Sequence, residues 1–133
     1  MSFLTAQTTV EDYFKNNFAH TAIKYENSEL DTESLDEFVS VHVLNAGTER
    51  ELFGATTPYI DGYMLQINIF TEKDTGKGCG LALADVLDGL FKEQVIGGYR
   101  FYVPTVDTVG MKSGDASQNF FQVAFKVDFD KFV

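Results

Sequence analysis

The strict alternation of residues 119–129 limits the fold more than any other feature of the sequence. Every second residue is large and apolar, and the residues between them are mostly polar or charged. The apolar set is Phe121, Val123, Phe125, Val127 and Phe129. A period of two residues is typical of a β-strand with one buried face and one face in water. Such a strand needs neighbouring strands and a second layer over its apolar face.

Two earlier segments repeat this period. In residues 38–44, Val39, Val41 and Val43 fall on one face, while His42 falls on the other. Residues 59–71 predict a long strand. Its predicted core face consists of Tyr63, Leu65, Ile67 and Ile69. Shorter strands are predicted at 22–26, 50–54 and 99–103, with a turn at 45–48 and a long polar loop at 105–117.

Two helices are predicted from apolar residues at a helical spacing. In residues 8–22, Thr8 and Glu11 fit a capping box, and the apolar stripe consists of Val10, Phe14 and Phe18. A second helix is predicted at 81–94, after a glycine-rich loop at 74–80. Its stripe consists of Leu83, Leu87, Leu90 and Phe91.

The order of these elements predicts an α+β fold with a mainly antiparallel sheet and two helices packed on one face. The length of 133 residues fits one domain, spanning residues 1–133. Neither an internal repeat nor a linker divides the chain.

Charge and cysteine content exclude several classes of protein. Lys and Arg number 10 against 20 Asp and Glu, so the net charge is −10, which argues against binding to nucleic acid or an anionic membrane. The single cysteine, Cys79, cannot form an intrachain disulfide. Neither a signal peptide nor a membrane-spanning stretch is recognisable, so we expect synthesis in the cytosol.

The familiar catalytic motifs are missing from the sequence. There is no Gly-x-Ser-x-Gly elbow, no His-Glu-x-x-His and no Cys-x-x-Cys. The acidic stretch at 26–37 lacks the spacing of a calcium loop, and the 74–80 loop fits neither phosphate-binding pattern. His42 and Cys79 are interpreted as structural. Composition and spacing alone therefore indicate an acidic α+β domain with no predicted metal site, and they favour binding or assembly over catalysis.

Five motifs, taken in order, resemble a known family. They are FVSVHVL (38–44), GYMLQINIFTEKDTGKG (62–78), LALADVLDGLFKE (81–93), GYRFYVPTVDTVG (98–110) and NFFQVAFKVDF (119–129). Together they resemble the tail terminator proteins of long-tailed bacteriophages, and most of all a set catalogued as a bacteriophage-related domain of unknown function. The matching positions include Ala82-Leu83-Ala84-Asp85, Phe91, Pro104, Gly110 and Phe121-Gln122.

The resemblance implies a structural, non-enzymatic role in the virion, with no active site and no cofactor. Such proteins form a hexameric ring on the finished tail tube, stop its polymerisation and present the surface that docks to the head. The expected partners are copies of the same chain, the tail tube protein and a head-completion or connector protein. DNA would pass through the lumen without specific binding, along an acidic wall. The expected location is the virion tail or neck, after assembly in the host cytoplasm.

A ring of identical subunits needs two different patches on each subunit. The predicted subunit interface consists of Arg50, Tyr59, Met64, Gln66 and Phe70, and the loops at 45–58 and 105–117 would reach neighbouring chains. Two alternatives stay open. One is another neck or tail component, either a head-completion or a tail tube subunit. The other is a small ligand-binding α+β domain with a pocket lined by His42, Cys79 or Tyr63.

Overall fold

The computed structural model describes residues 3–25, 37–50, 59–72, 78–111 and 120–132. These residues form two helices and seven strands. In chain order they are α1 (Phe3–Asn17), β1 (Ala22–Lys24), β2 (Phe38–Arg50), β3 (Tyr59–Glu72), α2 (Gly78–Phe91), β4 (Val95–Ile96), β5 (Tyr99–Phe101), β6 (Thr105–Met111) and β7 (Phe120–Phe132).

The strands form one sheet in the order β1-β2-β3-β7-β5-β4, and β6 also pairs with β7. The predicted α+β class is confirmed. The sheet is mixed rather than mainly antiparallel, because β1 runs parallel to β2 with Ala22 opposite Phe38. An alternating pattern shows that a strand has a buried face, but it carries no information on the direction of the neighbouring strand.

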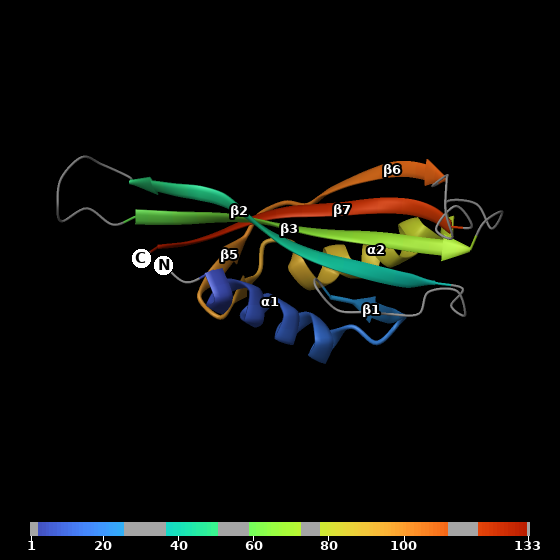
Figure 1. Ribbon diagram of the computed structural model, residues 1–133, viewed down its shortest axis with the longest axis horizontal. Helices are drawn as coiled ribbons and strands as arrows, with labels where there is room; N and C mark the ends of the chain where they lie inside the picture. The colour runs from blue at the N-terminus through green and yellow to red at the C-terminus, as the bar shows by residue number, and fades with distance from the viewer. Residues whose placement is uncertain (1–2, 26–36, 51–58, 73–77, 112–119, 133) are drawn as a thin grey trace.

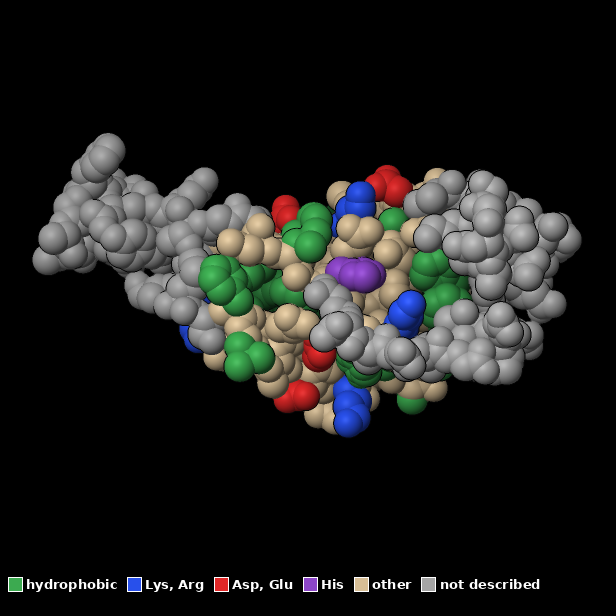
Figure 2. All heavy atoms as spheres, in the orientation of Figure 1, with side chains coloured by type: hydrophobic (Ala, Val, Ile, Leu, Met, Phe, Trp, Pro, Cys, Tyr) green, Lys and Arg blue, Asp and Glu red, His purple; other side chains and the backbone are tan. Residues whose placement is uncertain are grey.

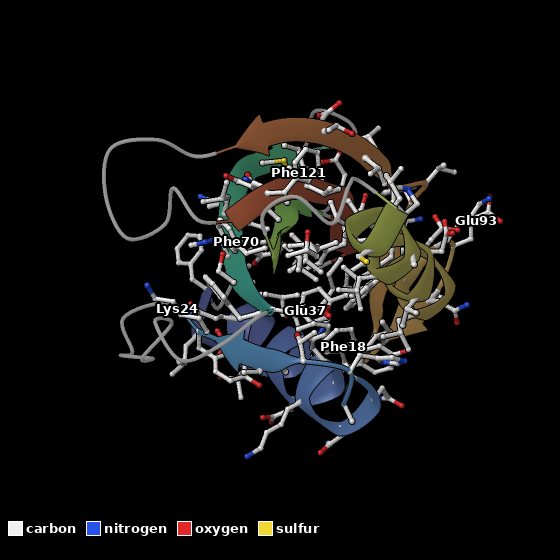
Figure 3. The ribbon with its side chains drawn as sticks, turned by 90° about the vertical axis from the view of Figure 1, so that its right-hand side faces the viewer. Phe18, Lys24, Glu37, Phe70, Glu93 and Phe121 are labelled. Carbon is white, nitrogen blue, oxygen red and sulfur yellow. The ribbon has the colours of Figure 1, made fainter. Side chains whose placement is uncertain are left out.

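Both helices cover the same face of the sheet. Figure 3 shows that the sheet curls, and that α1 and α2 lie on the inner side of the curl. One hydrophobic core joins α1, α2 and the inner faces of β2, β3 and β7. The predicted core faces of the three long strands are confirmed. The fully buried side chains include Leu65, Ile67, Ile69, Phe125 and Phe129.

Both helices begin earlier than predicted. The first starts at Phe3 rather than Thr8, so the predicted capping residue lies inside the helix. The true buried stripe also includes Ala6, and Phe18 lies just beyond the helix end, where its N–H bonds the carbonyl of Phe14 at 2.9 Å. The second helix starts at Gly78. A Cβ at Gly80 would approach Val123 Cγ2 to 2.8 Å, so that glycine brings the first turn close to the sheet.

Two segments predicted as irregular belong to strands. The predicted turn at 45–48 lies within β2, which passes through it by a bulge between Asn45 and Gly47. A glycine at a bulge looks like a turn signal in the sequence. The predicted loop at 105–117 begins with β6, which pairs with β7 from Thr105 to Met111. The described residues do not include 26–36, 51–58, 73–77 and 112–119. Most of the predicted acidic loop at 26–37 and most of the predicted strand at 50–54 therefore lie outside them.

The outer face of the sheet lies opposite the helices. On β7, this face is less exposed to solvent than the alternating pattern predicted. Gln122 is only 8% exposed and Ala124 only 3%. Nearby, the rings of Phe38 and Phe70 stack with their centroids 4.6 Å apart, and Ala22 packs against them. The outer face therefore carries a small second core at one end.

Candidate functional site

The predicted interface residues occupy two places on the β2–β3 pair. Met64, Gln66 and Phe70 are separated by multiples of two residues, so they share the outer face of β3. Arg50 and Tyr59 lie opposite each other at the far end of the pair. This end, residues 47–50 with 59–62, is called the hairpin arm here, and Figure 1 shows that it extends past both helices. The structure therefore places Met64, Gln66 and Phe70 on β3 of the sheet, and Arg50 and Tyr59 on the hairpin arm.

Phe70 differs from the other members of the predicted interface. It is only 6% exposed because its ring stacks on Phe38. Most of its apolar surface is thus already buried within the chain, so Phe70 offers little to a neighbouring subunit in this conformation.

The middle of the outer face is polar. The Gln66 side-chain amide donates to Asn68 Oδ1 at 3.0 Å, and Ser40 Oγ lies 3.3 Å from His42 Nε2. His42 is half-buried on this face, which is the face that the alternation predicted for it. On the side of the molecule seen in Figure 2, hydrophobic side chains reach the surface between such polar groups and scattered charges.

A charged network on β5 and β7 was not found from the sequence. Arg100 Nε donates to Asp130 Oδ1 at 2.9 Å, and its Nη2 lies 2.9 Å from the same oxygen. The Tyr102 hydroxyl donates to Asp130 Oδ2 at 2.6 Å. This hydrogen bond, followed by burial and the charge of Asp130, raises the pKa of Tyr102, and Arg100 acts in the opposite direction.

No signal in the sequence could have predicted this network. Arg100 and Asp130 are opposite each other in the β5–β7 register. They are thirty residues apart in the chain. The network can be predicted only when it is known that β5 and β7 are neighbouring strands.

The residues of the ligand-binding alternative do not share a pocket. Tyr63 is buried on the core face and stacks on Phe129, whereas His42 lies on the outer face. Cys79 is exposed in the first turn of α2. Among the described residues, no group of three or more His, Cys, Asp or Glu side chains is placed to hold a metal ion. Within the same part of the chain, neither helix is long and apolar enough to cross a membrane.

Comparison with known proteins shows the fold and nothing beyond it. No family model matches the chain, and no curated protein matches it. Among the solved structures that match is one of a protein whose name describes no function, with a TM-score of 0.64 and 20% sequence identity. The match covers 98% of this chain and 95% of the other, so the two share one architecture along nearly their whole length.

Proposed function

We propose that this protein is a structural subunit of a bacteriophage tail. It forms a ring on the tip of the tail tube, ends tube polymerisation and provides the surface to which the head docks. The observation that carries the proposal is the ordered set of motifs between Phe38 and Phe129. These motifs fall on β2, β3, α2, the β5–β6 segment and β7, which together make up most of the sheet and one of its two helices.

Exposed apolar side chains support a role in assembly. Leu44, Val95, Tyr102 and Val103 are all exposed, although the chain has a well-filled core. Scattered exposed apolar groups are common on monomers, but a ring subunit needs such groups on two sides. The hairpin arm adds reach, because its backbone extends past the helices.

The arm also favours a second candidate, a tail tube subunit. A long β-hairpin suits a contact between stacked rings, and β2 and β3 run for 13 and 14 residues. Both candidates are ring-forming tail components, and they differ in whether rings stack without limit. The terminator remains the first choice because the motif order resembles that family.

Electron microscopy and native mass spectrometry of the purified protein test the proposal. A terminator yields single closed rings, and when mixed with growing tail tubes it caps their tips and shortens them. Tubes that extend from this protein alone would support the tube subunit instead. A protein that neither forms rings nor binds tube tips would contradict both.

The predicted interface can be tested in the same assay. Met64→Asp and Arg50→Glu are expected to leave the monomer folded and to lower its association in light scattering. Met64 lies on the outer face and Arg50 on the arm, so the two variants report on separate surfaces. Gln66→Ala, which also lies on the outer face, is the milder control. Normal assembly by both charged variants would show that the predicted interface is wrong.

A further inference from the structure

We draw no further inference here: the strongest candidate, the outer face of the sheet around Met64 and the Arg100–Asp130–Tyr102 network, carries no proposal because nothing in the described part of the structure shows what covers it.

Discussion

Gly97 is the residue whose identity the fold restricts most clearly. It lies in the turn between β4 and β5 with a φ of 59°, in the left-handed region that side chains with a Cβ rarely adopt. A Cβ there would also approach Thr9 Cγ2 of α1 to 2.6 Å. The turn therefore fits against the helix only when residue 97 has no side chain.

Gly97→Ala is expected to lower the free energy of unfolding by about 1–3 kcal/mol, because it adds backbone strain and a steric clash. Urea denaturation measures this change. Gly89→Ala is the matched control, since Gly89 has a helical conformation with nothing within 4 Å of the added Cβ. It should raise stability by up to about 1 kcal/mol. Equal effects of the two substitutions would contradict the argument.

Thr71 carries a buried hydroxyl that finds no hydrogen-bond partner among the described residues. The residue is 1% exposed, so its hydroxyl lies away from the molecular surface. Thr71→Val keeps the shape and removes the polar atom, and is expected to stabilise the protein by about 1 kcal/mol in thermal unfolding. Thr71→Ala, which leaves a void, should destabilise it instead. A destabilising valine would mean that the hydroxyl is bonded.

The Tyr102–Asp130 hydrogen bond should be visible in an alkaline titration. The pKa of Tyr102 is raised above the ordinary 10.0, chiefly by this bond. A raised pKa contributes to folding stability below pH 10 and loses that contribution as the pH climbs through the folded value. Asp130→Asn should lower the pKa of Tyr102, as followed by the NMR signal of its ring. An unchanged pKa would show that the bond is absent in solution.

At the scale of elements, the three long strands and the second helix could be predicted from the sequence. Residues 38–44, 59–71 and 119–129 show their strand character because every second side chain enters the core. The helix at 81–94 was recognised for the same reason, through Leu83, Leu87 and Phe91. These are the elements in which burial follows a regular spacing along the chain.

The other elements depend on contacts that are distant in sequence. Residues 105–111 alternate poorly and include Gly110, and they form a strand because β7 supplies an edge to pair with. The bulge in β2 and the start of α2 at Gly78 depend in the same way on packing against other strands. In the candidate site, Met64 and Gln66 could be placed on an outer face, whereas the Arg100–Asp130–Tyr102 network required the strand order.

Hydrogen exchange should separate the central strands from the edges. β3 is paired along its length with β2 and β7, and β7 pairs on its other side with β5 and β6. The amides of Leu65–Ile69 and Val123–Val127 should therefore exchange most slowly, and those of β1 and β4 fastest. Mass spectrometry after timed deuteration measures the order. Protection of β4 equal to that of β3 would contradict this sheet order.

At the scale of the whole molecule, the net charge of −10 should oppose assembly. Copies of the chain repel one another at low ionic strength, and salt screens the repulsion over a Debye length of about 10 Å at 0.1 M. We therefore expect ring formation, measured by light scattering at neutral pH, to strengthen as salt is raised. If salt weakens it, attraction between opposite charges dominates the interface.

The place of β7 in the sheet has a consequence for biosynthesis. Residues 120–132 form the last strand in chain order, yet this strand lies between β3 on one side and β5 and β6 on the other. Until it leaves the ribosome, β3 has one unpaired edge, and β5 and β6 lack the strand that joins them to the sheet. A nascent chain thus lacks a complete core until these residues are translated, and a chain that stops before residue 120 cannot form this sheet.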